Sequence, residues 1–422
     1  MPLPLFPPLA RHPVRPSLRR CHWALLVLLP VVAALPAAVR AQTTPPDLTR
    51  ISIEDLMNIE ITSASRKEQR IKDVASAVFV ITQDDIRRSG MTTIPDLLRL
   101  APGVNVAQIN ANKWAVSVRG FNSLFATKLL VLVDGRSIYN RLYSGVFWDM
   151  LDLMVDDVER IEVIRGPGAS AWGANAVNGV INIVTKSAAD SQRGLVRADA
   201  GRSGTQAAVR YGGRAFNTPY RVFAQWTGRD ESVLVPGVGA NDGSYSVTAG
   251  LRADRSTGRG DFTLEGAFVT GRNRPLWLNF NAATAATEPV LNDSSETRGG
   301  HVLGRWAHTR DSGVLLQIQS SLDLADRREA VGHFTRHAFD VEAQARGTID
   351  RRHDVVAGVG YRWVGERLDG LNGVSLTPPD EHSTLVTAFV QDDIGLAAGR
   401  LHLILGTQAQ HDSFSGTGLQ PT

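Results

Sequence analysis

The sequence predicts two kinds of structure in series: a small α/β domain up to about residue 187, then antiparallel strands of the transmembrane β-barrel type from residue 194. Three observations lead to this prediction. The N-terminus carries an apolar segment typical of an export signal. Glycine-rich backbone joins two β-branched strands within residues 155–186. Beyond residue 194, apolar and polar residues alternate over segments of about ten residues, as they do in outer-membrane strands.

Residues 1–41 have the organisation of a signal peptide. Basic residues between Arg11 and Arg20 precede an apolar run, residues 23–35, which is too short and too interrupted by proline to span a membrane. Cleavage is expected after Ala41, and a membrane anchor is the alternative. Cys21, the one cysteine, would leave with the signal peptide, so the mature chain would have no disulfide and no cysteine-ligated metal.

The overall charge gives no support for nucleic-acid binding. The formal net charge is +3, from 45 basic and 42 acidic residues. Residues 1–41 hold five of the arginines and no acid, so the remainder has 40 basic against 42 acidic residues. A chain of 422 residues also exceeds the usual size of a single core, which predicts at least two structural units.

Residues 155–186 are expected to form strand, glycine-rich turn and strand. Both ends are rich in valine and isoleucine, and glycines and asparagines fill the middle. The run Gly166 to Ala171 formally fits a dinucleotide-binding motif, but that motif needs a helix opening at the turn. Gly173 and Gly179 stand where the helix would run, so we reject this interpretation.

The α/β domain can be predicted element by element. Residues 77–81 indicate a buried strand, and Thr82 with Asp85 fits a capping box for a short helix that ends at Gly90. Thr93 is expected to cap a second helix with Pro95 in its first turn. The remaining strands are expected at 104–106, 115–119, 129–133 and 160–164. The domain contains no histidine, which excludes Ser–His catalysis within it.

Two long runs resemble a known family. They are VSVRGFNSLFATKLLVLVDGR, residues 116–136, and ERIEVIRGPGASAWGANAVNGVINIVTK, residues 159–186. The second resembles the plug-to-barrel boundary of TonB-dependent outer-membrane receptors, and the first, further upstream, resembles the same family along its length. The resemblance implies a signal peptide at 1–41, a flexible periplasmic leader at 42–58, a TonB box at 59–63, a plug domain at 64–187 and a partial barrel at 194–422. It also implies residence in the outer membrane of a Gram-negative bacterium, in contact with its lipid.

A short β-prone run precedes the plug and has no evident hairpin partner nearby. Such a strand can add to the sheet edge of another protein. The resemblance assigns it as the TonB box and implies a TonB-like energy transducer of the inner membrane as partner. The alternative is an ordinary first strand of the plug. The assigned residues are Ile59, Glu60, Ile61, Thr62 and Ser63.

Two plug loops, residues 108–113 and 134–144, are the candidate ligand site. In the resembling receptors the corresponding loops face outward and touch the ligand. Hydrogen-bonding groups interleaved with aromatic rings suit a chelate or another polar, ring-bearing ligand, and plain turn chemistry is the alternative. The candidates are Gln108, Asn110, Asn112, Tyr139, Asn140, Arg141 and Tyr143. Other charged plug residues are expected to serve packing instead, namely Arg119, Arg136, Arg160, Glu162 and Arg165.

The alternation after residue 194 predicts about 11 strands. They are expected near 195–200, 205–212, 220–228, 244–253, 261–270, 296–308, 313–325, 336–348, 354–364, 383–394 and 400–410. Plugged transporters close with about 22 strands. The expected fold is therefore an N-terminal α/β plug domain followed by an incomplete antiparallel transmembrane β-barrel, as in a C-terminally truncated receptor. A smaller closed barrel is the alternative, but a plug of this size would not fit inside it.

The sequence therefore predicts a transporter and no enzyme, cofactor or resident metal site. The ten histidines lie without a carboxylate cluster typical of a catalytic metal, and the His333–His337 spacing is the one weak metal pattern. The expected function is TonB-dependent uptake of a scarce ligand. A ferric siderophore is the commonest cargo of the resembling family, with cobalamin, haem and oligosaccharides open. A passive porin, a non-functional truncated fragment, a secreted hydrolase and a signalling receptor are the alternatives.

Overall fold

The structure is a computed structural model, and the part described here lies within one compact unit, Asp55–Thr422. The described residues are 60–61, 69–70, 74, 76–126, 128–166, 172–173, 176–201, 204–234, 238–274, 276–281, 286–291, 295–329, 332–350, 352–371, 375–396 and 401–421. The expected signal peptide and leader therefore lie outside the described residues.

A five-stranded sheet forms the centre of the α/β domain, in the order β3-β8-β9-β6-β7. β8 and β9 pair antiparallel, with Ile161 opposite Ile183, which confirms the predicted strand–turn–strand unit. β6 lies parallel to β9. The strands are β3 (Ala77–Thr82), β6 (Leu129–Val133), β7 (Arg136–Ser137), β8 (Val158–Arg165) and β9 (Gly179–Thr185).

Two short helices follow β3, as predicted. α3 (Gln83–Ser89) begins at a capping box in which the Asp85 amide donates to Thr82 Oγ1 at 3.2 Å and the Thr82 amide donates to Asp85 Oδ2 at 2.9 Å. It ends at Gly90, whose φ of 66° favours glycine. α4 (Ile94–Leu97) is capped by Thr93 and continues as η3 (Leu98–Leu100). Among the described residues, no helix combines the length and hydropathy needed to cross a membrane.

The capping box gives a first testable prediction. Thr82→Ala should cost about 1 kcal/mol of helix stability, because the first turn loses the side-chain acceptor of its Asp85 amide. Faster hydrogen exchange of the α3 amides would measure this loss. Thr82→Ser keeps the hydroxyl and serves as the control. Equal exchange in the two variants would contradict the assigned cap.

The plug sheet buries a different cluster on each face. Ile161, Val163 and Ile181 pack with the helices and with Trp114 in the larger core. The other face carries a smaller cluster that includes Leu130, Leu132 and Val180. Trp114 belongs to a separate hairpin, β4 (Val104–Asn110) and β5 (Lys113–Val118), which covers the larger core.

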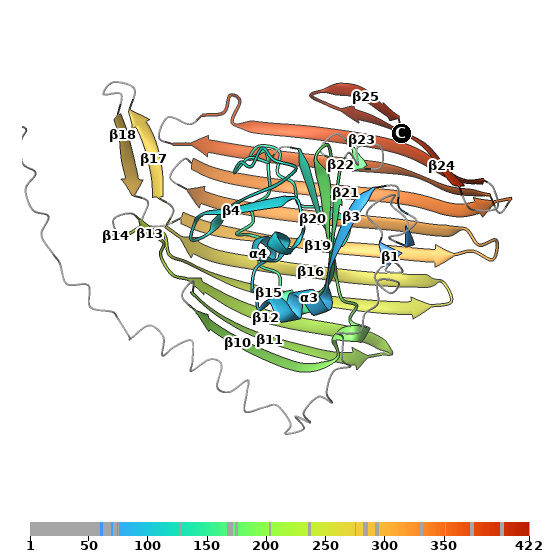
Figure 1. The fold of residues 1–422 in the computed structure, drawn as a ribbon, viewed down its shortest axis with the longest axis horizontal. Coiled ribbons are helices and arrows are strands. Elements are labelled where there is room, and N and C mark those ends of the chain that lie inside the picture. The colour runs from blue at the N-terminus through green and yellow to red at the C-terminus, as the bar shows by residue number, and fades with distance from the viewer. Residues whose placement is uncertain are drawn as a thin grey trace, which may run out of the picture. The chain divides into compact units, whose positions relative to one another are not determined.

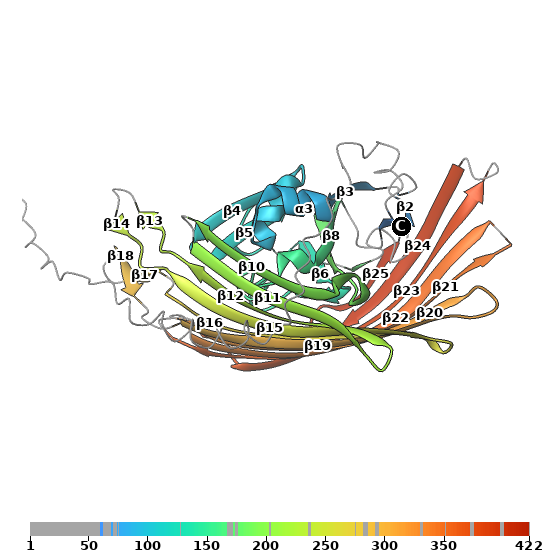
Figure 2. The same ribbon diagram turned by 90° about the horizontal axis from the view of Figure 1, so that it is seen from below.

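Twelve strands form the second sheet, and each pairs antiparallel with its neighbours (Figure 1). They are β10 (Arg193–Gly201), β11 (Gly204–Ala215), β12 (Thr218–Arg229), β15 (Ser244–Thr257), β16 (Gly260–Asn273), β19 (Ser295–Thr309), β20 (Leu315–Glu329), β21 (Gly332–Ile349), β22 (His353–Gly370), β23 (Asp380–Leu396), β24 (Leu401–Asp412) and β25 (Gly416–Pro421). Figure 2 shows the sheet curving beneath the plug, which lies on its concave side. β10 and β25 are its two edges.

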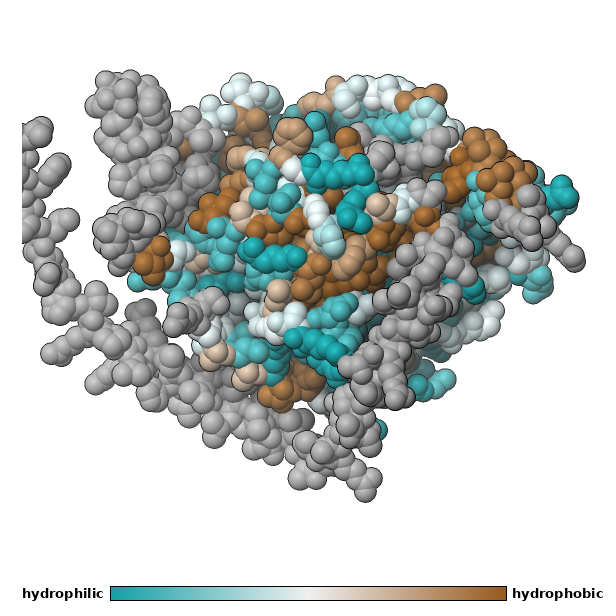
Figure 3. Space-filling view, viewed as in Figure 1, coloured by the Kyte–Doolittle hydropathy of each residue, from teal (hydrophilic) through white to brown (hydrophobic). Residues whose placement is uncertain are grey.

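The predicted alternation is confirmed, whereas the predicted number of strands is one too low. In β12, Trp226 is 40% exposed on the outer face, and Gln225 beside it is 3% exposed toward the plug. The missed strand is β25, which pairs with β24 in the register His411↔Thr417. Its glycines and polar residues give little apolar alternation. Figure 3, which looks onto the plug, shows hydrophilic and hydrophobic residues interspersed over this face.

The connections between strands differ in length at the two ends of the sheet. At one end they are short, for example residues 216–217 and 258–259. At the other end two of them carry small hairpins, β13 (Val233–Leu234) with β14 (Val238–Gly239) and β17 (Leu276–Asn281) with β18 (Ala286–Leu291). β22 and β23 extend beyond their expected ranges of 354–364 and 383–394, so that residues 371–379 lie between them.

Candidate functional site

The first candidate loop is the tip of the β4–β5 hairpin. Contrary to the prediction, Gln108 and Asn110 lie within β4, so the turn itself is short. Asn110 Oδ1 accepts hydrogen bonds from the backbone amides of Asn112 at 3.1 Å and Lys113 at 2.8 Å. Gln108 Nε2 lies 3.5 Å from the Ala111 carbonyl oxygen. These side chains therefore stabilise the turn, which is the alternative that the sequence left open.

Asn112, at the same tip, has a different environment. Its side chain is 3% exposed, and neither of its amide side-chain atoms has a hydrogen-bond partner among the described residues. It lines a cavity of about 30 Å³ together with Trp114, Asp149 and Asp152. A polar cavity of this volume has room for about two water molecules. Asn112 is thus the residue of this loop whose side-chain amide can still form hydrogen bonds with another molecule.

The second candidate loop is closed by Asn140. Its backbone exchanges hydrogen bonds with Gly145 at 2.8 and 3.1 Å, and Asn140 Oδ1 accepts from the Tyr143 amide at 2.7 Å. Asn140 is 3% exposed. Its side chain is therefore committed to the turn.

Aromatic rings surround Tyr143. Its ring centroid lies 5.3 Å from that of Phe125 and 4.1 Å from that of Phe147, and Phe147 lies 5.8 Å from Phe334 of β21. Burial raises the pKa of the Tyr143 hydroxyl above its ordinary value. The row of rings therefore continues from the plug onto the sheet and is exposed at Phe125.

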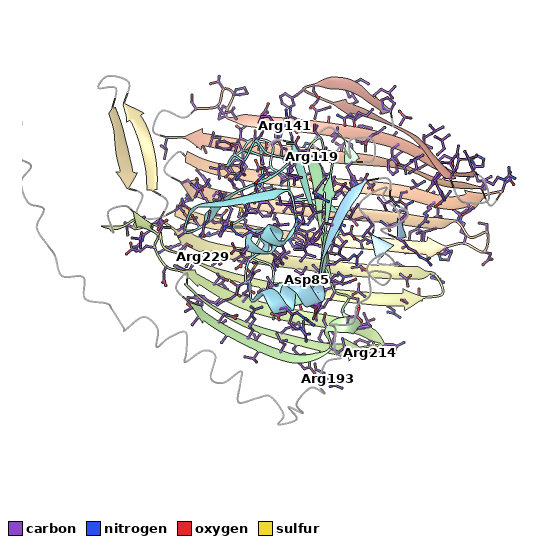
Figure 4. All side chains as sticks on the ribbon, viewed as in Figure 1. Asp85, Arg119, Arg141, Arg193, Arg214 and Arg229 are labelled. Carbon is purple, nitrogen blue, oxygen red and sulfur yellow. The ribbon has the colours of Figure 1, made fainter. Side chains whose placement is uncertain are left out.

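Tyr139 and Arg141 lie at the edge of this loop and face the strands β21 to β24. The Tyr139 carbonyl accepts from Arg336 Nη2 at 3.4 Å, and burial raises the pKa of the Tyr139 hydroxyl. Arg141 pairs with Asp412 at 3.5 Å, and its guanidinium lies 4.0 Å from the ring centroid of Phe414. Figure 4 labels Arg141 beside the upper strands. Its side chain is 38% exposed, so it can meet a ligand.

A buried ion network connects the two loops. Arg327 of β20 donates to Asp149 at 3.1 and 2.9 Å and to Glu329 at 2.6 Å. Lys113 Nζ lies 3.3 Å from Glu329, and the Arg327 guanidinium lies 4.2 Å from the ring centroid of Phe147. Burial lowers the pKa of Lys113, and Glu329 partly offsets that effect. The structure therefore brings the tip at Lys113 and the rings around Tyr143 to one place.

A larger cavity, of about 760 Å³, lies between the plug and the sheet. Tyr139 and Arg141 line it, whereas the other five candidates do not. Sequence reasoning missed the residues that the sheet contributes, among them Arg336, Asp340 and Arg362. These residues follow the ordinary polar-inward alternation, and no local pattern separates them from structural neighbours.

The candidate TonB box is described only at Glu60 and Ile61, which form β1 (Glu60–Ile61); Ile59, Thr62 and Ser63 lie outside the described residues. The expectation that this run has no hairpin partner is wrong, because β1 pairs antiparallel with β2 (Gln69–Arg70). Residues 62–68 connect the two strands and are longer than a common hairpin turn, so turn signals could not reveal the pairing. Ile61 is fully buried.

The β1–β2 hairpin also contacts the sheet. Gln69 Nε2 donates to Asp393 Oδ2 of β23 at 3.3 Å. Asp393 stands near the end of β23 that leads into the short connection at 397–400. Figure 1 accordingly shows β1 at the end of the sheet opposite the hairpin β17–β18. β1 and the loop that carries Tyr143, named the aromatic loop below, thus lie toward opposite ends of the plug.

The charged plug residues that were expected to serve packing do so. Arg119 donates to the Arg165 carbonyl at 3.1 Å, and Arg165 donates to the Pro102 carbonyl at 3.2 Å. Arg160 Nε donates to Glu162 at 2.8 Å. Arg136 forms an ion pair with Asp323 of β20.

The weak histidine pattern gains no support as a metal site. His333 Nε2 lies 3.2 Å from Asp326 Oδ1. Within the part of the chain that the structure describes, no group of three or more histidine, cysteine or acidic side chains is arranged to hold a metal ion.

Comparison with known proteins identifies the plug. Residues 70–180 match the family described as TonB-dependent Receptor Plug Domain. The vitamin B12 transporter BtuB of Vibrio vulnificus (strain CMCP6) is 34% identical over 143 residues, which are 33% of this chain and 23% of the transporter. The chain thus matches about a quarter of the length of this curated relative.

Solved structures extend the likeness to the second sheet. The siderophore receptor PirA from Pseudomonas aeruginosa superposes with a TM-score of 0.61 at 20% identity, over 82% of this chain and 57% of that receptor. The pyoverdine receptor FpvA from Pseudomonas aeruginosa PAO1, bound to pyoverdine, gives a TM-score of 0.68 at 14% identity, over 86% and 60%. At these identities the likeness establishes the fold.

A plug on the concave side of an antiparallel, outward-apolar sheet is the architecture of plugged outer-membrane receptors. Residues 70–180 therefore form a plug domain of the TonB-dependent receptor family, and the twelve strands that follow have the fold of the barrel-type sheet in solved receptors. Receptors of this family lie in the outer membrane of Gram-negative bacteria.

Proposed function

We propose that the protein takes part in active import of a scarce ligand across the outer membrane, driven by a TonB-like transducer of the inner membrane. The observation that carries this proposal is the arrangement of the plug. It lies on the concave side of the sheet, with the aromatic loop toward one end and β1 toward the other. A ligand-sensing end and a coupling end on one small domain suit ligand-gated transport. A plug in this position does not favour a passive porin.

The proposed ligand is a ferric siderophore. Solved siderophore receptors that share the fold support this class, whereas the BtuB relatives, which are vitamin B12 transporters, keep cobalamin as the second candidate. On the plug, we assign ligand contact to Asn112, Tyr139, Arg141 and Tyr143, which offer unpaired amide atoms, an accessible guanidinium and stacked rings. Gln108, Asn110 and Asn140 support these residues by closing the turns.

The proposed export and coupling segments precede the plug. Residues 1–41 serve as the signal peptide, 42–58 as a periplasmic leader, 59–63 as the TonB box, and 64–187 and 194–422 as plug and barrel segments. A TonB-like partner would pair with the backbone of the box once β1 leaves β2, since an extended strand can add to a partner's sheet edge. Pulling on this strand would then remodel the plug. The work is binding and mechanical, with no covalent catalysis.

Deleting residues 59–63 tests the mechanism. Uptake of radiolabelled vitamin B12 and of ferric pyoverdine by cells that produce the protein identifies a transported probe. For that probe, the deletion should reduce uptake to the level of cells lacking the protein while surface binding persists, because the binding loops are untouched. A matched deletion of residues 43–47, in the leader, should leave uptake intact. Unchanged uptake after removal of 59–63 would refute the assignment of the box.

A further inference from the structure

Three arginines lie close together on the outer face of the sheet, which is the face turned away from the plug. They are Arg272 of β16, Arg298 of β19 and Arg328 of β20, on three adjacent strands, and all three are exposed. The alternation along β20 shows the two faces, because Arg327 is 2% exposed beneath the plug whereas the next residue points outward. Phe334, which ends the row of aromatic rings, lies opposite Arg327 in the register, so the three arginines stand at the end of the sheet that the aromatic loop occupies.

Acidic side chains neutralise only part of this cluster. Glu296 lies opposite both Arg272 and Arg328 in the register of the three strands. Arg272 donates to Glu296 at 3.2 and 2.7 Å, whereas Arg298 approaches it only to 3.6 Å. The Arg328 guanidinium forms no ion pair with any residue that the structure describes. The second acid nearby, Asp326, pairs with a histidine of β21. Two guanidiniums of the cluster can therefore still donate hydrogen bonds to an anion.

An apolar surface continues from the arginines toward the middle of the strands. Four residues along its own strand from each arginine stands an exposed apolar side chain. Side chains four residues apart in a strand share a face. These residues are Phe268, Val302 and Leu324, which are 53, 52 and 45% exposed. Exposed apolar side chains with arginines beyond them are expected where a sheet passes from the acyl chains of a membrane to its headgroups.

We propose that the arginine cluster binds the phosphate groups of an anionic glycolipid of the lipid A type, whose acyl chains lie along the apolar surface. A guanidinium can donate two parallel hydrogen bonds to one phosphate. A lipid with more than one phosphate can meet both guanidiniums that remain available, at Arg298 and Arg328. The choice of the outer leaflet rests on the proposed function, which turns the aromatic loop outward. The site faces away from the plug, so it attaches the protein to the membrane and does not touch the transported ligand.

Binding of lipid A to the detergent-purified protein tests this site. The unmodified chain, the double variant Arg298→Gln/Arg328→Gln and the variant Arg367→Gln are titrated with lipid A and with dephosphorylated lipid A, and the bound lipid is counted by native mass spectrometry. Arg367 is the matched control, because it is also about half exposed near the same end of the sheet but is held by Asp369 and Asp380.

The double variant should bind lipid A severalfold more weakly than the unmodified chain, whereas Arg367→Gln should bind it as tightly as the unmodified chain does. Dephosphorylated lipid A should bind all three proteins equally weakly. Equal lipid A affinities in the three proteins would overturn the site, and so would equal affinities of the unmodified chain for the two lipids. Displacement of lipid A by an equal concentration of phosphatidylglycerol would overturn the assignment to a glycolipid.

A second double variant separates loss of binding from loss of fold. Arg298→Lys/Arg328→Lys keeps both charges and removes the paired donors, so its affinity for lipid A should lie between those of the unmodified chain and the glutamine variant. An affinity as low as that of the glutamine variant would overturn the role of charge. If lipid affinities were equal throughout while deletion of residues 59–63 still abolished uptake, the lipid site would fail and the proposed function would stand.

Discussion

Replacing Arg327 by methionine is expected to weaken the plug's attachment to the sheet by about 3–5 kcal/mol, the usual cost of removing one partner of a buried ion pair. Arg327 is 2% exposed and bonds to both Asp149 and Glu329. Without the guanidinium, two buried carboxylates share Lys113 as the cation left in this network. Urea titration followed by hydrogen exchange of the plug amides should show release of the plug at a lower urea concentration.

An exposed arginine network provides the control for this prediction. Arg367 pairs with Asp369 and Asp380, and all three side chains are about half exposed. Arg367→Met should change stability by roughly 0–1 kcal/mol, because water already solvates these charges. If the two methionine variants shifted the transition equally, burial would not be the source of the effect at Arg327.

Alanine at Gly179 is expected to disrupt the pairing of β8 with β9. A Cβ at this position would lie 2.4 Å from the backbone carbonyl oxygen of Ile164, so one of the two strands must shift. Overpacking of this kind costs about 1–3 kcal/mol. The strands also contribute Ile161 and Ile183 to the plug core. Hydrogen exchange should therefore accelerate along both strands and their neighbours in the sheet.

Gly194 of β10 is a suitable comparison, because a Cβ there would meet no heavy atom within 4 Å. Gly194→Ala should change stability by no more than about 0.5 kcal/mol. If hydrogen exchange along β8 and β9 were equally fast in Gly179→Ala and Gly194→Ala, the close approach of Gly179 to Ile164 would not be what stabilises this strand pair.

Local patterns predicted those parts of the fold that depend on neighbouring residues. The capping box of Thr82 and Asp85 is defined by a spacing of three residues, and Gly90 ends the same helix through its own φ. The alternation around Trp226 places each side chain on a face of the sheet without knowledge of the partner strand. Each of these features could be predicted from one short segment of the sequence alone.

The features that were missed depend on contacts between distant segments. β25 is a strand because β24 offers it an edge, since its own glycines carry little preference. β1 pairs with β2 across a long connection. In the candidate site, Tyr143 was selected from the sequence, but Lys113, Arg327 and Glu329 were not, since only the fold brings β20 against both loops.

The ion pairs between the plug and the sheet limit which plug and sheet segments can be combined in one protein. Two arginines of the sheet, Arg210 and Arg221, form ion pairs with Asp157 of the plug. In the opposite arrangement, Arg136 of the plug pairs with Asp323 of the sheet. A plug transferred from another receptor would place its charged side chains against guanidinium and carboxylate groups of the sheet that are positioned for a different plug. Functional chimaeras should therefore require exchange of these matched residues as a set.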